Sequence, residues 1–334
     1  MSLKDLLLSH LKKEKGRWIS GESLSRGMSV TRSAIWKHVR RLRQEGYLIE
    51  SSPKKGYLLQ NIPDLISESE IRDGLNTKIL GRKKIVCLRE MDSTNARAKA
   101  LAISGAPEGT VVIAESQTHG KGRKGRSWFS PCGGGVYLSV VLRPRIPPTE
   151  APKITLLAAV AASEAIASLL PLHIAIKWPN DLVVGGKKIA GILTEISTEM
   201  DTIDYMIVGI GINVNIATAQ FPPEIRSTAA SILSETGKPY PRVKLIREYL
   251  ASLERCYGSV GGEGFEPVMN KWRAQSNVIG RRIMIDVLGR KYYGEVEDID
   301  PDGVLILRDG KGELRRFFSG DVTILRTRAG RRSF

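Results

Sequence analysis

The chain has 334 residues, and its 51 Lys and Arg against 35 Asp and Glu give a formal net charge of +16. This length predicts two or three domains, and a hydrophobic content of 42% with 26% charged residues argues against wholesale disorder. No apolar run reaches the roughly 20 residues of a membrane helix, the N-terminus lacks a signal-peptide core, and three scattered cysteines make neither a disulfide framework nor a metal site. We therefore expect a cytoplasmic protein without a membrane segment.

The positive charge is concentrated in three zones. Residues 1–60 hold 13 basic and 5 acidic residues, residues 117–126 hold four basic residues and no acid, and so do residues 322–334. The rest of the chain nets to zero, which predicts up to three contacts with anionic partners. Any one zone can also be an ordinary solvated surface, and this alternative is favoured for the last few residues, which have the composition of a frayed tail.

Residues 1–62 are expected to form a winged helix-turn-helix domain. The leucines near the start mark one face of a first helix, residues 21–26 form a second, and Ser29 or Thr31 can cap a third. Strands at residues 47–50 and 57–59 then flank a basic turn. The residues expected to contact DNA lie outward on the third helix and in this turn: Ser33, Lys37, Arg40, Arg41, Lys54 and Lys55.

This arrangement is suited to DNA, because a helix fits the major groove while Lys and Arg around it neutralise phosphates. Trp36 can pack in the core or face the nucleic acid, and the core is favoured. The alternative for the whole module is one that binds protein or spaces domains, since folds are reused for different functions. The excess of basic residues in this part of the chain weighs against that alternative.

The remaining pattern completes a multidomain α+β chain. Residues 63–80 are expected to be a linker, residues 81–276 a mixed α/β domain, and residues 277–334 a small SH3-like β-barrel. In the central domain we expect strands at residues 85–88, 111–114, 136–142, 174–178, 189–196 and 205–210, and helices at 95–103, 154–170, 242–257 and 265–275. In the barrel we expect strands at residues 282–287, 292–298, 304–308 and 314–318.

A glycine-rich basic loop is the first segment with candidate chemistry. Residues 117–128, QTHGKGRKGRSW, interleave three glycines with four cations. Glycines let backbone N–H groups approach an anion and the cations neutralise it, although the GxxxxGK[ST] spacing of a P-loop is missing. A solvated basic loop accounts for this segment equally well when it is taken alone.

Three further segments are weaker by themselves. KWPND (residues 177–181) ends a strand, and Lys188 on the next strand can meet a carboxylate or phosphate, although a lone Lys is more often a surface residue. GIGINVN (residues 209–215) suits a flat ligand lying on backbone, and it is also typical of close strand packing. DSTN (residues 92–95) can bind a polar ligand or simply cap a helix.

The common catalytic motifs are absent from the sequence. It contains no HExxH, CxxC or GxSxG motif and no evident nucleophile–base pair. We therefore expect any enzyme here to rely on positioning and charge neutralisation, as phosphoryl and nucleotidyl transfer do.

Taken together, GKGRKGRSWFSP, KWPNDLVVGGKKIAGIL, GIGINVN and DSTN resemble the motifs of the biotin protein ligases. The preceding winged helix makes the chain similar to the bifunctional members that also repress biotin synthesis genes, and the resemblance covers nearly the whole chain. It implies that ATP, with Mg²⁺, activates biotin to biotinyl-5′-AMP. Biotin then passes to a lysine of an acceptor such as the biotin carboxyl carrier protein of acetyl-CoA carboxylase. The adenylate-bound protein is expected to form a homodimer and bind operator DNA.

The resemblance also implies the site residues. The biotin pocket is expected to contain Ser93, Thr94, Asn95, Gln117, Gly120, Lys121, Arg123, Lys188, Gly191, Gly209 and Gly211. The adenylate is expected to meet Arg123, Arg126, Trp128, Asn180, Lys188, Asn213 and, from the barrel, Arg326. Arg123 and Lys188 are the candidate catalytic residues, Trp128 is expected to cover the adenylate, and no metal ligand is assigned.

One position departs from the family pattern, which usually reads GRGRxGR. Lys121 occupies the first Arg position, so the positive charge is kept, but the planar guanidinium that can donate two parallel hydrogen bonds is lost. We predict that this position works through its backbone. Two other functions remain alternatives: a repressor that only senses biotin or a nucleotide, and a lipoate ligase of the same architecture.

Overall fold

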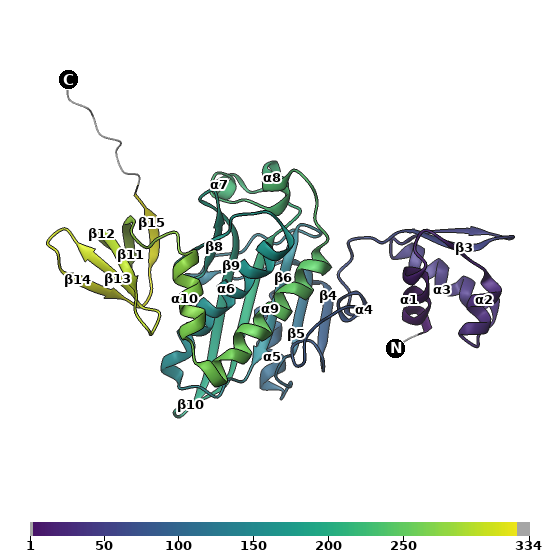
Figure 1. Cartoon of the computed structure of the whole chain (residues 1–334), viewed down its shortest axis with the longest axis horizontal. Coiled ribbons are helices and arrows are strands. Elements are labelled where there is room, and N and C mark those ends of the chain that lie inside the picture. The colour runs from purple at the N-terminus through teal and green to yellow at the C-terminus, as the bar shows by residue number, and fades with distance from the viewer. Residues whose placement is uncertain (1–2, 326–334) are drawn as a thin grey trace, which may run out of the picture. The chain divides into compact units, whose positions relative to one another are not determined.

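The computed structural model describes residues 3–325. The chain divides into two compact units, Met1–Leu65 and Ile66–Phe334, and each is described by itself. The first is the N-terminal part in purple in Figure 1. The second contains the two larger sheets.

The first unit has the helices and hairpin that the sequence predicts. Its elements are α1 (Leu3–Lys13), β1 (Trp18–Ile19), α2 (Gly21–Gly27), α3 (Arg32–Gln44), β2 (Leu48–Ser52) and β3 (Gly56–Asn61). The strands form an antiparallel sheet in the order β1-β3-β2, so the short strand β1 is an addition to the predicted hairpin. The turn between β2 and β3 is the wing.

Helix α3 is fixed by its cap and its buried face. The side chain of Thr31 accepts a hydrogen bond from the backbone N–H of Ala34 at 3.2 Å, which satisfies one of the free donors of the first turn. Ile35, Val39 and Leu42 pack into the core of this unit. The expectation that Trp36 packs in the core is wrong, because the helical turn of about 100° per residue from buried Ile35 places Trp36 on the outward face.

A seven-stranded sheet forms the centre of the second unit (Figure 1). Its strands lie in the order β4-β5-β6-β10-β9-β8-β7, and only β4 and β5 pair in parallel. Their bounds are β4 (Ile85–Met91), β5 (Val111–Gln117), β6 (Gly135–Leu142), β7 (Ala175–Lys177), β8 (Asp181–Val184), β9 (Lys187–Glu199) and β10 (Thr202–Asn213). The helices of this part are α4 (Glu68–Arg72), α5 (Thr94–Ile103), α6 (Ala151–Leu169), α7 (Pro223–Arg226), α8 (Ile232–Thr236), α9 (Arg242–Glu263) and α10 (Glu266–Gln275).

Helices cover both faces of this sheet. Alternate strand residues such as Val111 and Ile113 belong to the main core with α6 and α9, whereas Val112 belongs to a smaller cluster under α5. Successive side chains of a strand point to opposite faces, so α5 lies on the face opposite α6 and α9. By length and composition alone α6 with its preceding turn is apolar enough to cross a membrane, but it is mostly buried in this core.

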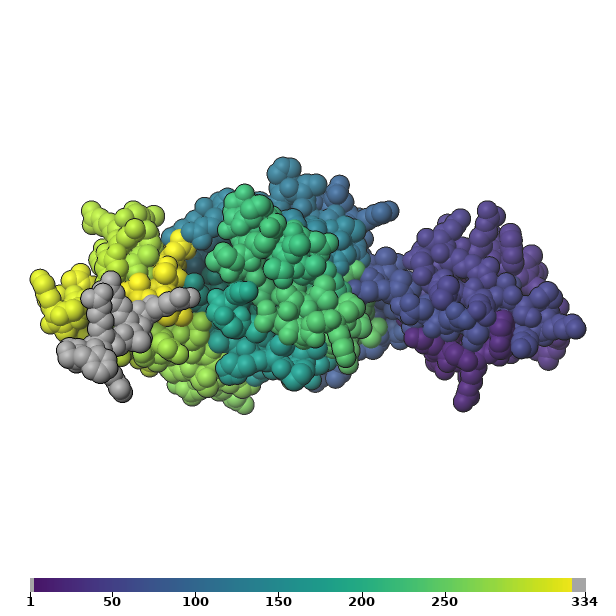
Figure 2. Space-filling view, turned by 90° about the horizontal axis from the view of Figure 1, so that it is seen from above, coloured from purple at the N-terminus to yellow at the C-terminus, as the bar shows by residue number. Residues whose placement is uncertain are grey.

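The C-terminal sheet has five strands in the order β14-β13-β12-β11-β15. Their bounds are β11 (Arg282–Val287), β12 (Arg290–Ile299), β13 (Leu305–Asp309), β14 (Leu314–Phe317) and β15 (Asp321–Ile324). The indole N–H of Trp178 donates to the carbonyl of Gly303 at 3.1 Å, and the two sheets share one hydrophobic cluster. Figure 2 shows these yellow segments packed directly against the teal and green surface of the same unit.

Most of the predicted linker belongs to the second unit. The segment from residue 66 to residue 80 contains α4 and contributes Leu75 and Leu80 to the main core.

Cys87, Cys132 and Cys256 are free thiols. Burial raises the pKa of Cys87 to about 12, so this thiol is not a nucleophile at neutral pH.

Candidate active site

A cavity of about 430 Å³ opens on the α5 face of the central sheet. Along β10 the residues on that face are Tyr205 and Ile207, which α5 covers, followed by Gly209 and Gly211. The register places Gly211 beside Gly191 of β9. Because three neighbouring positions lack side chains, the sheet is left hollow just beyond the first turn of α5. The alternating GIGIN pattern therefore lies inside a strand and forms the floor of the cavity.

The first turn of α5 and the end of β5 supply the polar end of the cavity. The Gln117 side-chain carbonyl accepts hydrogen bonds from the backbone N–H of Thr94 at 2.8 Å and from its hydroxyl at 3.2 Å. The Asn95 amide donates to Glu195 at 2.7 Å and accepts from the hydroxyl of Ser139 at 2.7 Å. These side chains are held before any ligand arrives, which preorganises the polar groups.

Ser93 acts as the cap of α5. Its hydroxyl accepts from the backbone N–H of Ala96 at 3.5 Å, and the side chain is 1% exposed. The helix-cap alternative for the DSTN segment is therefore confirmed, and the same residue also lines the cavity. Ligand binding by this segment stays a prediction.

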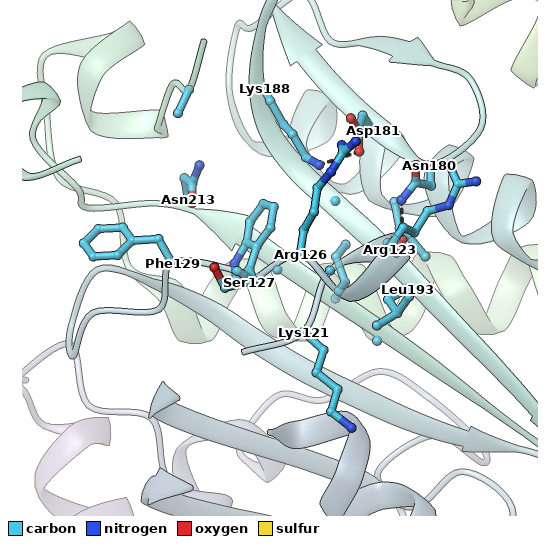
Figure 3. A pocket seen from close by; sticks show the side chains of 18 of the residues that line it. Lys121, Arg123, Arg126, Ser127, Phe129, Asn180, Asp181, Lys188, Leu193 and Asn213 are labelled. Carbon is cyan, nitrogen blue, oxygen red and sulfur yellow. Dashed lines mark hydrogen bonds and ion pairs between the residues drawn. The ribbon is translucent and has the colours of Figure 1, made fainter. Parts of the chain in front are cut away.

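The opposite end of the cavity is cationic (Figure 3). Arg123 of the glycine-rich loop donates to the Asn180 side-chain carbonyl at 3.2 Å, and the Asn180 amide in turn donates to the backbone of Ile192 at 2.7 Å. The Lys188 ammonium lies 2.6 Å from the Asp181 carboxylate. A loop cation and a strand cation are therefore each positioned by a residue of the KWPND segment.

The backbone around Lys188 is fixed on both sides. Its N–H donates to the carbonyl of Thr228 at 2.7 Å, and its carbonyl accepts from the N–H of Ala230 at 2.8 Å. Asn213, at the end of β10, also donates to the carbonyl of Ala230 at 2.9 Å. The segment before α8 therefore holds the start of β9 and the end of β10 together.

The cations of the cavity are crowded and partly buried. Burial lowers the pKa of Arg123. The negative charges of Asp321 and Asp181 oppose this shift, and the positive charge of Arg126 adds to it. Burial also lowers the pKa of Lys177, with the charge of Lys188 acting in the same direction. An anion in the cavity would relieve this repulsion, because opposite charges stabilise the charged form of each group.

The indole of Trp128 lies directly on the glycine floor. A β-carbon on Gly211 would be 2.3 Å from its ring nitrogen, and one on Gly191 would be 3.0 Å from its six-membered ring. The Lys188 ammonium is 5.2 Å from the ring centroid, within cation–π range. Within the described residues the buried indole N–H has no hydrogen-bond partner, so a ligand acceptor would satisfy it.

The C-terminal sheet contacts the glycine-rich loop through Asp321 at the start of β15. Its carboxylate is paired with Lys124 at 3.2 Å and with Arg126. Burial raises the pKa of Asp321, but the combined effect of Lys124 and Arg126 lowers it by more than burial raises it. The net shift of this pKa is downward, so the carboxylate is charged at neutral pH. Asp321 also lines the cavity, which makes the site a joint product of both sheets.

The structure brings most of the predicted site residues together. Those that line the one cavity are Ser93, Thr94, Asn95, Gln117, Lys121, Arg123, Arg126, Trp128, Asn180, Lys188, Gly191, Gly209, Gly211 and Asn213. Gly120 does not line it. A β-carbon there would be 2.5 Å from the backbone oxygen of Trp128, so Gly120 permits close chain packing behind the loop. Arg326 lies outside the described residues.

The Lys121 side chain and the predicted DNA contacts are placed apart from the cationic cluster of the cavity. The Lys121 side chain is directed away from Arg123 and Lys188 in Figure 3, and its backbone forms a bridge with Ser127. The predicted DNA contacts are all exposed on α3 and the wing: Ser33, Lys37, Arg40, Arg41, Lys54 and Lys55.

Sequence reasoning missed several lining residues. Lys177 and Asp181 stand inside the KWPND motif, so their position at a strand end was the available signal. Ser139 does not line the cavity, but its hydroxyl hydrogen-bonds Thr94 and Asn95, which do. Its signal was a polar residue, 0% exposed, in an otherwise hydrophobic run. Asp321 had no local signal, because the domain docking that brings it to the loop is not encoded in nearby residues.

Replacing Gly209 by alanine should disrupt the polar end of the cavity. The new β-carbon would be 1.9 Å from the Asn95 side-chain oxygen, so Asn95 must leave its bonds to Ser139 and Glu195. We expect a loss of about 1–3 kcal/mol in unfolding free energy and weaker ligand binding, measured by thermal melting and calorimetry. Gly261→Ala on α9 is the matched control, because nothing lies within 4 Å of that site. Equal melting temperatures for Gly209→Ala and the native chain would contradict the assigned contact.

Replacing Asp321 by asparagine should loosen the glycine-rich loop. An ion pair at this exposure is worth about 0–1 kcal/mol, so we expect trypsin to cleave the ligand-free loop about two- to fivefold faster. Glu295→Gln on β12, an exposed carboxylate of the same sheet, is the control. If both variants are cleaved at the native rate, Asp321 does not restrain the loop.

Three family models match the chain in separate segments. The biotin/lipoate A/B protein ligase family matches residues 88–213, a helix-turn-helix (HTH) domain matches residues 4–58, and the biotin protein ligase C-terminal domain matches residues 278–325. The first match spans the DSTN segment, the glycine-rich loop and the whole glycine floor.

Relatives of known function match almost the whole chain. The bifunctional ligase/repressor BirA of Bacillus subtilis is 39% identical over 92% of this chain and 94% of its own length. The BirA protein of Escherichia coli is 30% identical over 92% of this chain and 94% of its own length. The structure of biotin protein ligase from Aquifex aeolicus in complex with biotin and ATP superposes with a TM-score of 0.63 and 29% identity, over 73% of this chain and 100% of that one. The chain therefore belongs to the biotin protein ligase family and, because the match includes the helix-turn-helix domain, to its bifunctional ligase/repressor members.

Proposed function

We propose that the cavity binds biotin and ATP side by side and joins them as biotinyl-5′-AMP. The observation that carries this proposal is the pairing of a small, hydrogen-bonded polar pocket with a cluster of cations in one cavity. The biotin carboxylate attacks the α-phosphorus of ATP, the bond to the β-phosphate oxygen breaks, and pyrophosphate leaves with the electron pair. No protein nucleophile is needed.

The polar end of the cavity is suited to the biotin ring. Thr94 and Gln117 offer a hydroxyl and an amide at the end of α5, and a ureido group has both donors and acceptors that match them. The missing side chain of Gly209 lets Asn95 lie against the strand, and this leaves room beside both residues for the flat ring system. Asn95 and Ser139 hold this wall rigid.

The cationic end is suited to the carboxylate and the phosphates. Negative charge accumulates on the α-phosphate oxygens in the transition state, where Arg123 and Lys188 can stabilise it. Trp128, with its unpaired indole N–H, is suited to cover the adenylate, and Arg126 and Asn213 line the nucleotide side. We assign Arg326 to the same side.

We propose that Mg²⁺, bound together with the nucleotide, would supply positive charge to the phosphates. Mg²⁺ commonly keeps several waters and binds through substrate phosphates with one or two carboxylates. The described residues contain no group of three or more His, Cys, Asp or Glu side chains that could hold a metal ion. Asp181 and Asp321 are the carboxylates of the cavity, so they are the candidates to meet such an ion.

In the second step we propose that a lysine amine of a biotin carboxyl carrier protein attacks the mixed anhydride. An amide bond forms, AMP leaves, and the amine loses a proton. The adenylate-bound protein would also dimerise and bind a palindromic biotin operator in the cytoplasm, because a two-fold dimer presents two winged helices to two half-sites.

One assay tests the catalytic proposal and separates it from its rivals. The protein is incubated with ATP, Mg²⁺, an acceptor domain, and labelled biotin or labelled lipoate. We expect biotin on the acceptor lysine. Transfer of lipoate alone would contradict the biotin assignment, and transfer of neither would leave only a ligand-sensing repressor. Footprinting on the promoter of the chain's own biotin genes, with and without adenylate, tests the repressor role.

A further inference from the structure

A tryptophan stands on the outward face of the helix that the winged fold would present to DNA. Trp36 is 54% exposed, one turn into α3. Ser33 and Arg40 lie three and four residues from Trp36 and share its face, and Lys37 lies four residues from Ser33 along the same exposed side. Ile35 and Val39 are buried on the opposite face. The first unit therefore leaves a tryptophan side chain outside its own core.

The surroundings of this tryptophan are cationic and available. The Arg40 guanidinium lies 5.7 Å from the indole centroid. In the part of the chain that the structure describes, no ion pair involves Lys37, Arg40 or Arg41, whereas Arg26 and Arg32 on the neighbouring surface both pair with Glu22. A large apolar ring amid unpaired cations matches a polyanion that also displays apolar groups.

Double-stranded DNA has that chemistry. In the major groove the thymine C5-methyl is an apolar group on the base edges, and apolar side chains recognise it. The N-terminal part of a recognition helix is the part that reaches base edges, and Trp36 lies there. A protein surface complementary to Trp36 would have to be strongly acidic as well, whereas DNA is acidic everywhere.

The second cationic element is the wing. The Lys55 ammonium lies 5.8 Å from the ring of Trp18, which orients it at the tip of the turn. Gly56 makes this turn possible: its φ is +95°, and a β-carbon there would be 2.0 Å from the backbone oxygen of Ile19. The wing is thus anchored to β1, and its lysines are placed for the phosphate backbone.

We propose that Trp36 is a specificity-determining residue that contacts a thymine methyl group in each half-site, while Lys37 and Arg40 contact phosphates. This inference rests on the proposed operator binding. It assigns sequence readout to a residue that the charge pattern alone would pass over.

The test begins with selection of binding sites from a random-sequence duplex pool. The full-length protein is used with biotin and ATP, beside Trp36→Ala and Lys37→Ala. We expect Trp36→Ala to bind the selected site about tenfold more weakly, to bind random duplex as before, and to select a site with relaxed preference at one position per half-site. Lys37→Ala should weaken selected and random duplexes alike and reduce the salt slope by about one.

A thymine-to-uracil scan of the selected site then isolates the methyl group. For the native protein, one substitution in each half-site should cost affinity, and the same substitution should cost nothing for Trp36→Ala. Biotin transfer by Trp36→Ala and its melting temperature serve as folding controls, since the cavity belongs to the other unit.

Several results would overturn the proposal. Unchanged affinity and unchanged site preference in Trp36→Ala would remove the readout role, and an equal loss on every duplex would make Trp36 a general contact. Loss of dimerisation in sedimentation, with DNA preference intact in the residual dimer, would assign Trp36 to a second copy of the chain. If the native protein selects no sequence at all, the proposed operator binding fails together with this inference.

Discussion

Lys188→Ala is expected to slow the formation of biotinyl-5′-AMP by at least about 100-fold, the usual cost of removing a fixed stabiliser of transition-state charge. The Lys188 ammonium is held by Asp181 at 2.6 Å, and its backbone is paired on both sides with residues 228–230. The charge is therefore preorganised and needs no reorganisation when phosphate charge develops. Pyrophosphate release in a single turnover, with biotin and ATP saturating, measures the step.

The neighbouring lysine gives the matched control. Lys187 is exposed at the start of the same strand and does not line the cavity, so Lys187→Ala removes the same charge one residue away. We expect its rate within about twofold of the native rate, since surface substitutions are usually near neutral. Lys188→Arg should recover only part of the activity, because the guanidinium is planar and larger. Similar rates for Lys187→Ala and Lys188→Ala would show that the position of the charge does not matter.

The same removal predicts a change in the neighbouring groups. Without Lys188, Asp181 loses its ion pair, and the repulsion that lowers the pKa of Lys177 decreases. Lys188→Ala should therefore retain its fold, because it removes a cation from a crowded positive cluster. A circular dichroism melt separates this outcome from unfolding as the cause of lost activity.

The sequence was sufficient for elements with a local signal. The buried runs of β5, β6 and β10, the apolar helix α6 and the capped helix α3 are all encoded by periodicity and end signals within a few residues. Their bounds shifted by a few residues, as at β9, which extends beyond the predicted 189–196 to Lys187–Glu199. The missed strand β1 has only two residues and depends on pairing with β3.

Contacts between distant segments were beyond sequence reasoning. Asp321 and Lys124 are far apart in the chain, and only docking of the C-terminal sheet brings them together. The floor shows an intermediate case. Its glycines are visible in GIGIN, but their role as a hollow follows only from the alternation along β10 and the register with Gly191.

Exposure on helix α3 shows a limit of a different kind. The periodicity correctly predicted that Ile35, Val39 and Leu42 are buried, whereas the hydrophobicity of Trp36 favoured a buried position for it as well. The helical repeat and the hydrophobicity gave opposite answers, and the helical repeat prevailed because the inward stripe was already filled. A large apolar residue that breaks the periodic pattern is thus a candidate for binding rather than for the core.

Arg123→Gly is expected to release the adenylate about 10- to 100-fold faster, from the loss of about 1.5–3 kcal/mol of charge-assisted hydrogen bonding. Arg123 joins the glycine-rich loop to Asn180 at 3.2 Å, and Asn180 is fixed to β9 through Ile192. The side chain therefore supplies charge to the ligand and also ties the loop across the cavity. Glycine removes both contributions and adds backbone freedom.

Dissociation is measured by forming labelled adenylate on the protein, adding excess unlabelled biotin and ATP, and following the label that remains bound. Arg123→Lys keeps the charge without the fork, so its rate should lie between the two. His119→Ala, an exposed change in the same segment, is the control for disturbance of the loop. An adenylate that leaves Arg123→Gly and the native protein at the same rate would refute the retaining role. Arg123 would then act only in the first chemical step, and the loop would be held by its Lys124 and Arg126 pairs with Asp321.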